Sequence, residues 1–340
     1  MVLIPGTKEW HNQVIEEIIE PDRPIVDSHH HLWVMNPFQD GTAYLLEDLW
    51  EDTDTGHNIK KTVFIECNSN YLEDGPEHMK PIGETKFVAE IAKQSINNSN
   101  KANISAIISH ANLNLGEKIN DVLDAHDELG QGLFRGIRHA GASHPNPDEA
   151  YFPGKYNPDQ FLQKDFQAGV RLLGKRGYTY ESWQYHFQLQ NFYALARAAP
   201  DTKIILDHLG SPFGTKSYKE QSDVIFNQWK NDIDAIASCR NVYAKLGGLA
   251  HPDNGFGWHE AEKPAISEDL VKTQKHFYLY TIEAFGVERC MFESNFPVDK
   301  LSISYPTFWN ACKKMVSDFS EDEKEALFYG TASRVYQLDK

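Results

Sequence analysis

Eight short runs of apolar and β-branched residues recur along this 340-residue chain, and their repetition constrains the fold more than any other feature. Each run is followed by enough residues for a loop and a helix, a pattern typical of alternating strands and helices. The runs lie at residues 25–26, 62–66, 104–109, 133–138, 177–181, 203–207, 241–245 and 289–293. Eight such units in one domain's length predict an α/β fold, a (β/α)8 TIM barrel of parallel strands.

Several intervals between these runs have helical periodicity. Apolar residues recur at helical spacing in segments 83–98 and 219–238. Segment 267–286 begins with Ser267, which we expect to be the N-cap, and ends at Gly286. An open doubly wound sheet is the main alternative, but no G-x-G-x-x-G motif follows the first run, which weakens a dinucleotide site.

The chain contains no segment typical of an interdomain linker. We expect residues 1–24 to form an N-terminal extension and residues 25–340 to form one barrel domain. Two long connections, 139–160 after the fourth run and 247–266 after the seventh, are rich in glycine, proline and aromatic residues. Their composition favours lids over a pocket.

The amino-acid composition limits the classes of molecule that the protein is expected to bind. The chain has 33 Lys and Arg against 49 Asp and Glu, a net charge of −16, which argues against nucleic acid and anionic membranes as partners. Its four cysteines are far apart and its beginning lacks the pattern of a signal peptide, so we expect a cytoplasmic protein with reduced thiols. A small-molecule substrate fits best, and the sequence leaves open whether the chain forms a homo-oligomer.

The strongest local signal is the segment IVDSHHHLW at residues 25–33. Because side chains alternate along a strand, His29 and His31 are expected on one side and His30 on the other. Two imidazoles at the open end of a barrel are suited to bind a metal ion or to polarise a carbonyl group. A histidine-rich turn without a ligand is the alternative.

Two later strand ends carry further catalytic candidates. His208 follows the apolar run KIILD, and its position favours a functional role. Met291, Glu293 and Asn295 would share one face of the eighth strand, so that a carboxylate and an amide look into the barrel. A buried Glu293 is suited to move protons, although a structural ion pair with an arginine is the alternative.

Six other side chains are candidates for substrate binding. An arginine in a barrel mouth is costly unless an anion is expected, which favours Arg138 as the group that holds a carboxylate or an oxyanion. The remaining candidates are His139, Glu66, Lys245, Trp258 and His259.

In chain order, IVDSHHHLW (25–33), FRGIRH (134–139), ILDHLG (205–210), KLGG (245–248) and MFESNFPVD (291–299) resemble the amidohydrolase-related family, specifically its branch of sugar-lactone and muconolactone hydrolases. The resemblance runs from about residue 25 to the end of the sequence. It implies a TIM barrel that hydrolyses a lactone or another cyclic ester or amide.

The resemblance also bears on a metal. In metal-using members, the residues matching His29, His31 and a later histidine, here His208, bind a divalent ion that is usually zinc. Other lactonase-like members work without a tightly held metal. The family's last strand usually ends in Gly-Ser-Asp-Trp-Pro, whereas this chain has Glu293-Ser294-Asn295-Phe296-Pro297, with Asn295 in place of the ligating Asp. Asn cannot accept a proton near neutral pH, so Glu293 is the expected substitute.

The sequence therefore predicts a hydrolase that opens the lactone ring of a small sugar-acid or dicarboxylic metabolite. His29, His31 and His208 would polarise the carbonyl, either directly or through one divalent ion. Two alternatives stay open. One is a metal-dependent non-oxidative decarboxylase of the same superfamily, against which Asn295 argues, and the other is a non-catalytic ligand-binding barrel.

Overall fold

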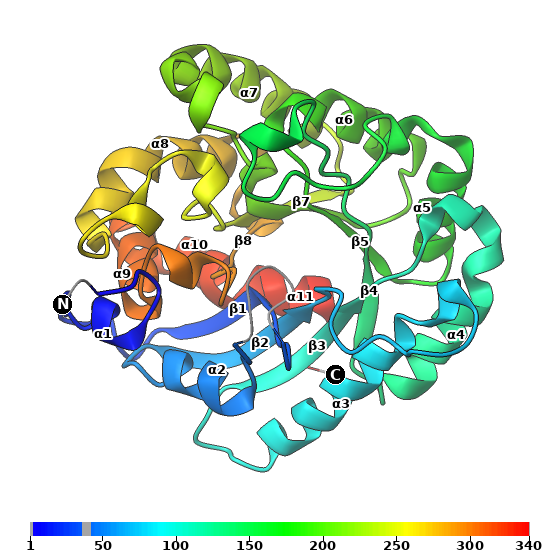
Figure 1. Ribbon diagram of the computed structural model, residues 1–340, viewed down its shortest axis with the longest axis horizontal. Helices are drawn as coiled ribbons and strands as arrows, with labels where there is room; N and C mark the ends of the chain where they lie inside the picture. The colour runs from blue at the N-terminus through cyan, green and yellow to red at the C-terminus, as the bar shows by residue number, and fades with distance from the viewer. Residues whose placement is uncertain (1–2, 36–41, 340) are drawn as a thin grey trace.

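The computed structural model describes residues 3–35 and 42–339. Its eight strands form one parallel sheet in chain order, which curls into a barrel (Figure 1). The strands are β1 (Pro24–His30), β2 (Asn58–Ile65), β3 (Asn103–Ser109), β4 (Phe134–Arg138), β5 (Thr179–Ser182), β6 (Ile204–Leu206), β7 (Val242–Leu246) and β8 (Cys290–Phe292). Each coincides with one of the predicted runs, and the (β/α)8 barrel is confirmed.

The barrel closes between β1 and the segment that follows β8. The backbone N–H of His31 donates to the carbonyl of Phe296 at 2.8 Å, and that of Asn295 donates to the carbonyl of His29 at 3.0 Å. The buried carboxylate of Asp27 accepts the Ser294 hydroxyl at 2.6 Å and the Ser294 backbone N–H at 2.9 Å. Asp27 therefore holds the two edges of the sheet together rather than facing the candidate ligands.

Helices surround the strands (Figure 1). They are α1 (Lys8–His11), α2 (Leu46–Thr53), α3 (Ile82–Ile96), α4 (Asn120–Leu129), α5 (Lys164–Lys175), α6 (Leu189–Ala198), α7 (Ser222–Ala237), α8 (Ser267–Phe285), α9 (Tyr305–Met315), α10 (Glu321–Glu325) and α11 (Thr331–Tyr336). The N-cap prediction for α8 is wrong, because Ile266 precedes the helix and Asp269 accepts its backbone N–H. Ser267 instead donates its hydroxyl to Glu16.

The N-terminal segment packs on its own barrel. The indole of Trp10 donates to the carbonyl of Ala261 at 3.1 Å, and the ring of His11 donates to the carbonyl of Lys300 at 2.8 Å. Both side chains are buried. In the part of the chain that the structure describes, no helix is both long enough and apolar enough to cross a membrane.

The last helix fills the barrel interior from the amino ends of the strands. Val335, Tyr336 and Leu338 pack in one cluster with inward-facing residues of β1, β2, β3, β6 and β8. Lys61 and Arg135 donate to the carbonyls of Leu338 and Tyr336, which fixes this segment beneath the barrel. The hydroxyl of Tyr336 reaches up to Glu181 Oε1 at 2.7 Å. The C-terminal helix thus forms the floor under the functional side chains.

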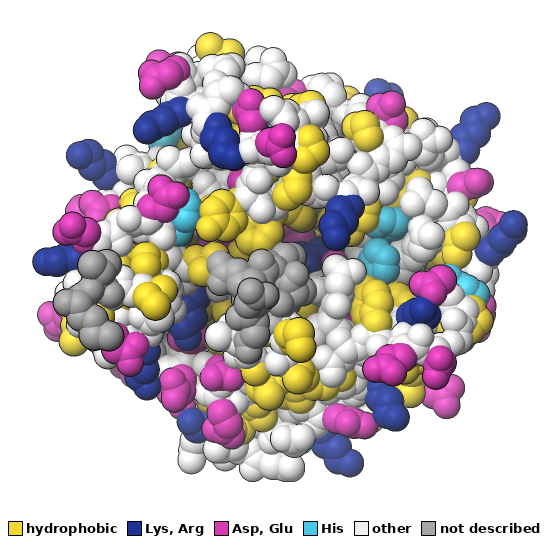
Figure 2. All heavy atoms as spheres, viewed as in Figure 1, with side chains coloured by type: hydrophobic (Ala, Val, Ile, Leu, Met, Phe, Trp, Pro, Cys, Tyr) yellow, Lys and Arg dark blue, Asp and Glu magenta, His cyan; other side chains and the backbone are white. Residues whose placement is uncertain are grey.

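The two predicted lid segments follow β4 and β7 and are joined to each other. The buried carboxylate of Asp253 in the second loop accepts the backbone N–H groups of Tyr151 and Phe152 in the first, and the hydroxyl of Tyr185. On the face shown in Figure 2, acidic side chains are distributed around the edge rather than gathered in one patch. The acidic side chains on this face therefore do not indicate a binding surface.

A single arginine links the ends of two helices to the sheet. The guanidinium of Arg289 donates to the carbonyls of Phe285 at 3.1 Å, Ala237 at 3.0 Å, Cys239 at 3.0 Å and Val242 at 3.2 Å. We predict that Arg289→Met lowers the free energy of unfolding by about 2 kcal/mol, because these carbonyls lose their donors. Chemical denaturation measures the change, with the exposed Arg240→Met as control. Equal effects of the two substitutions would contradict the prediction.

Candidate active site

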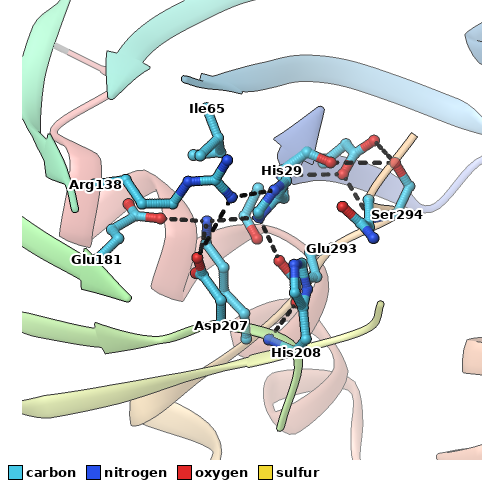
Figure 3. A network of polar contacts seen from close by, with 12 residues as sticks. His29, Ile65, Arg138, Glu181, Asp207, His208, Glu293 and Ser294 are labelled. Carbon is cyan, nitrogen blue, oxygen red and sulfur yellow. Dashed lines mark hydrogen bonds and ion pairs between the residues drawn. The ribbon is translucent and has the colours of Figure 1, made fainter. Parts of the chain in front are cut away.

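Polar side chains from seven strand ends meet inside the carboxyl end of the barrel. Figure 3 labels those of β1, β4, β5, β6 and β8. Each is buried and lies at the end of its strand or within the next few residues. They are His29 and His31 from β1, Glu66 from β2, Arg138 from β4, Glu181 from β5, Asp207 and His208 from β6, Lys245 from β7 and Glu293 from β8.

The three predicted histidines come together. The Nδ1–H of His31 donates to the carbonyl of Ile65 at 2.8 Å, so the lone pair of His31 is on Nε2, which lies 3.1 Å from Nε2 of His29. The ring centres of His29 and His208 are 4.7 Å apart. Burial lowers the pKa of all three imidazoles, that of His208 to about 3. They are therefore neutral at pH 7.

Glu293 lies between two of these histidines. Its Oε1 accepts the backbone N–H of His208 at 2.9 Å and the Nδ1–H of the same ring at 2.7 Å. Its Oε2 is 2.8 Å from His29 Nδ1, but it makes no hydrogen bond. Burial raises the pKa of Glu293 to about 7, although Lys245 opposes this effect. The carboxyl group can therefore change protonation near neutral pH.

Two glycines explain how these side chains fit. A Cβ at Gly248 would lie 2.2 Å from Nδ1 of His208, and a Cβ at Gly247 would lie 1.9 Å from the carbonyl oxygen of Glu293. The Gly247-Gly248 pair after β7 thus leaves the space that the imidazole and the backbone after β8 occupy. His208 itself has a φ of 54°, a left-handed conformation that turns its ring back toward the strand ends.

Two buried cations flank His29. The ammonium of Lys245 donates to Glu181 at 2.6 Å and lies 3.5 Å from Asp207 and 3.3 Å from His29 Nδ1. Although burial opposes it, these carboxylates raise the pKa of Lys245. On the other side, Nη1 of Arg138 lies 3.4 Å from His29 Nε2.

Arg138 already has a carboxylate partner. Its Nε donates to Glu66 Oε1 at 2.8 Å, and its Nη2 donates to the Glu66 backbone carbonyl. Both residues are predicted from the sequence, but their pairing is not. Glu181 is not among the predicted residues, although it ends a predicted strand, which is the signal that indicated Glu293.

Asn295 is placed differently from the sequence expectation. β8 ends at Phe292, and Asn295 has a φ of 57°, so the alternation of side chains does not continue to this residue. The Asn295 amide donates to Asp299 at 2.9 Å, and Asp299 also accepts the backbone N–H of Ala250. This pair fixes the loop after β7.

Three other predicted substrate-binding residues lie in the loops around the cluster. His139 accepts the backbone N–H of Leu113 and packs against aromatic rings. Trp258 stacks on Phe256 at 4.9 Å, and His259 contacts the ring of Tyr151 at 5.4 Å. These contacts place them in the walls of the barrel mouth.

The residues present fit a divalent cation. One nitrogen each from His29 and His208 and one oxygen from Glu293 lie within 4.8 Å of one another. Glu293 Oε2 and both carboxylate oxygens of Asp207 are buried without a hydrogen-bond partner, so electron-rich atoms surround this position. Two imidazoles and a carboxylate are a donor set that zinc accepts. His31 also has the backbone-anchored ring typical of a ligand.

Comparison with known proteins identifies the family. The Amidohydrolase family model matches residues 26–338. The chain belongs to this family. The uncharacterized protein y4mH of Sinorhizobium fredii is 31% identical over 336 residues, covering 93% of this chain and 99% of that protein. L-fucono-1,5-lactonase of Burkholderia multivorans is 26% identical over 258 residues, or 75% of this chain and 77% of the lactonase.

A solved structure shows the same architecture. A crystal structure of a B. multivorans amidohydrolase with bound zinc has a TM-score of 0.71 and 22% sequence identity, and the match covers 93% of this chain and 99% of that one. At this level of identity the likeness establishes the barrel fold. Amidohydrolase family members bind zinc, and the donor set described above is compatible with that chemistry.

Buried carboxyl groups make stability depend on pH. Burial raises the pKa of Glu181 to about 7 and that of Asp299 to about 8. Between the ordinary carboxyl pKa of about 4 and these values, each of the two groups binds a proton in the folded protein but not in the unfolded chain, so its contribution to the free energy of unfolding falls as pH rises.

We therefore predict that between pH 7 and pH 9, above the range in which histidines of the unfolded chain titrate, the melting temperature falls more steeply in the wild type than in Asp299→Asn. The asparagine can still accept the N–H of Ala250, but it cannot ionise. Calorimetry across this range is the measurement, with the exposed Asp318→Asn as control. A decline as steep in Asp299→Asn as in the wild type would contradict a raised pKa of Asp299.

Proposed function

We propose that the protein hydrolyses the ring ester of a small lactone. The observation that carries this proposal is the carboxyl group of Glu293, which lies between two neutral imidazoles, titrates near pH 7 and has one oxygen without a hydrogen bond. This is the arrangement that a general base for water requires. Membership of the amidohydrolase family and the similarity to L-fucono-1,5-lactonase support it.

The residues divide the work as follows. Glu293 removes a proton from water as the water oxygen attacks the carbonyl carbon. Arg138 and Lys245, 3.4 and 3.3 Å from the two nitrogens of His29, place positive charge beside the oxyanion that develops. The bond between the carbonyl carbon and the ring oxygen then breaks, and the ring oxygen receives the proton from Glu293. The product is an open-chain hydroxy acid.

His29, His208 and Glu293 would hold a divalent ion, which as a Lewis acid would polarise the carbonyl and lower the pKa of water. His31, held by the Ile65 carbonyl, and His208, held by Glu293, are uncharged and orient the carbonyl from their own positions. His31 packs against His29, since the Nε2 atoms of the two rings are 3.1 Å apart.

Replacing the proposed base gives the first test. Glu293→Gln keeps the shape of the side chain but cannot accept a proton, so we expect kcat to fall by about 10²- to 10⁴-fold. Hydrolysis of a panel of lactones is measured with the metal content of each preparation, and the exposed Glu260→Gln in the loop after β7 serves as control. Full activity in Glu293→Gln would exclude this residue as the base.

The pH dependence gives a second test. The pKa of Glu293 is raised to about 7 and that of His208 is lowered to about 3, so the two candidate bases titrate in separate ranges. Because a base acts when deprotonated, kcat/KM should rise with pH and level off above about 7. A profile that is flat from pH 5 to 9 would argue against Glu293. Loss of carbon dioxide from an aromatic acid, without lactone hydrolysis, would favour the decarboxylase alternative.

A further inference from the structure

Three buried polar atoms next to the catalytic cluster have no hydrogen-bond partner. They are Oε2 of Glu66, Oε2 of Glu84 and the hydroxyl oxygen of Tyr71. Glu66 and Tyr71 belong to the loop after β2, and Glu84 lies in the first turn of α3. All three are therefore at the carboxyl end of the barrel, where His29 and His31 also lie. The mechanism proposed above uses none of these atoms.

Glu66 connects this group to the reaction centre. Its Oε1 is held by Arg138, whose Nη1 lies 3.4 Å from His29. The carboxylate is 2% exposed, and its second oxygen is free to accept a hydrogen bond. A ligand bound to Oε2 of Glu66 would therefore be connected to His29 through the Glu66 carboxylate and the Arg138 guanidinium.

Glu84 is also held in place by one oxygen only. Its Oε1 accepts the backbone N–H groups of Cys67 at 3.0 Å and Ser69 at 2.8 Å. A Cβ at the neighbouring Gly83 would lie 2.5 Å from the carbonyl oxygen of Asn70, so the loop packs directly on the start of α3. The backbone contacts thus fix Glu84 with Oε2 unused.

The three residues lie close to one another, because Glu84 accepts the N–H of Cys67, the residue after Glu66, and a Cβ at Gly83 would lie 3.0 Å from the carbonyl carbon of Tyr71. Burial and then the carboxylates of Glu84 and Glu66 raise the pKa of Tyr71, and burial and then Glu66 raise the pKa of Glu84 to about 8. No hydrogen bond joins Glu66 Oε2, Glu84 Oε2 and the Tyr71 hydroxyl. Aromatic rings line the region, since His110 stacks on Tyr71 with their centres 6.5 Å apart.

Leaving a buried polar atom without a partner costs about 1–3 kcal/mol, so three in one place are a strong indication of a missing polar ligand. We propose that Glu66, Glu84 and Tyr71 form a specificity subsite that binds the hydroxyl groups of a neutral, polyhydroxylated lactone. This inference rests on the proposed lactone hydrolysis and narrows its substrate to the sugar-lactone class.

The chemistry of the three groups selects hydroxyl groups over a carboxylate. A hydroxyl group both donates and accepts, so it can satisfy the acceptor Glu66 and also pair with the Tyr71 hydroxyl. A carboxylate on the substrate has no proton to donate and would meet the negative charge of Glu66. The positive charge of Arg138 is already paired with Glu66, and its remaining Nη1 lies at His29. A dicarboxylic lactone is therefore disfavoured.

The test compares two lactones that differ in hydroxyl groups, D-glucono-1,5-lactone and δ-valerolactone. The wild type should prefer the hydroxylated lactone in kcat/KM. Tyr71→Phe and Glu84→Gln should each lower that preference by about tenfold, the effect expected for one lost hydrogen bond, mainly through KM. Glu90→Gln, an exposed substitution on the same helix, should leave it unchanged. Melting temperatures show whether each variant is folded.

The outcomes separate the subsite from the reaction. If Tyr71→Phe and Glu84→Gln lower turnover of both lactones equally, or if the wild type prefers 2-pyrone-4,6-dicarboxylate, the subsite is wrong while lactone hydrolysis stands. If the wild type opens no lactone, the proposed function fails. Calorimetric titration with the non-hydrolysable D-glucono-1,5-lactam then decides the subsite. Binding that Tyr71→Phe weakens supports the subsite, and no binding overturns it.

Discussion

The site depends on the pairing of buried charges of opposite sign at the carboxyl end of the barrel. The ammonium of Lys245 is fully buried and is stabilised by Glu181 and Asp207. Removing either partner would leave a charge in a medium that solvates it poorly. In turn, Lys245 opposes the effect of burial on the carboxyl group of Glu293. Without this ammonium, Glu293 would hold its proton more tightly and would be a poorer candidate for a base at neutral pH.

The same principle joins the reaction centre to the loops. Arg138 lies between His29 and Glu66, and Glu84 is held at the residue after Glu66, Cys67. A substitution at the rim can therefore alter the electrostatics of the imidazoles without touching them. In barrels of this kind, strands fix the chemistry and loops vary the substrate, and here one ion pair belongs to both parts.

Sequence reasoning succeeded where the backbone is regular. His29 and His31 extend from the end of β1, and alternation placed their rings on one side, with His30 bonded to Thr62 on the other. The same rule did not hold for Asn295, because a left-handed residue after β8 redirects the chain. Local periodicity contains no information about that turn.

Other parts of the site had weaker signals or none. Glu181 ends a predicted strand, so the reasoning that identified Glu293 could also have identified Glu181. Tyr71 and Glu84 occupy a loop and a helix start, and only the packing of α3 against the loop shows that they lie near Glu66. The fold therefore follows from the repeat of strand and helix, whereas the pairing of charges depends on three-dimensional contacts.

The position of α11 has a consequence for how the protein is made. Val335 and Tyr336 seal the barrel interior, yet they follow all eight strands in the sequence. While the chain emerges from the ribosome, the completed sheet must keep an unfilled, apolar centre until these residues arrive. A growing chain that has already formed every strand is thus still exposed to aggregation and to binding by chaperones, and Glu181 gains the Tyr336 hydroxyl only at that final stage.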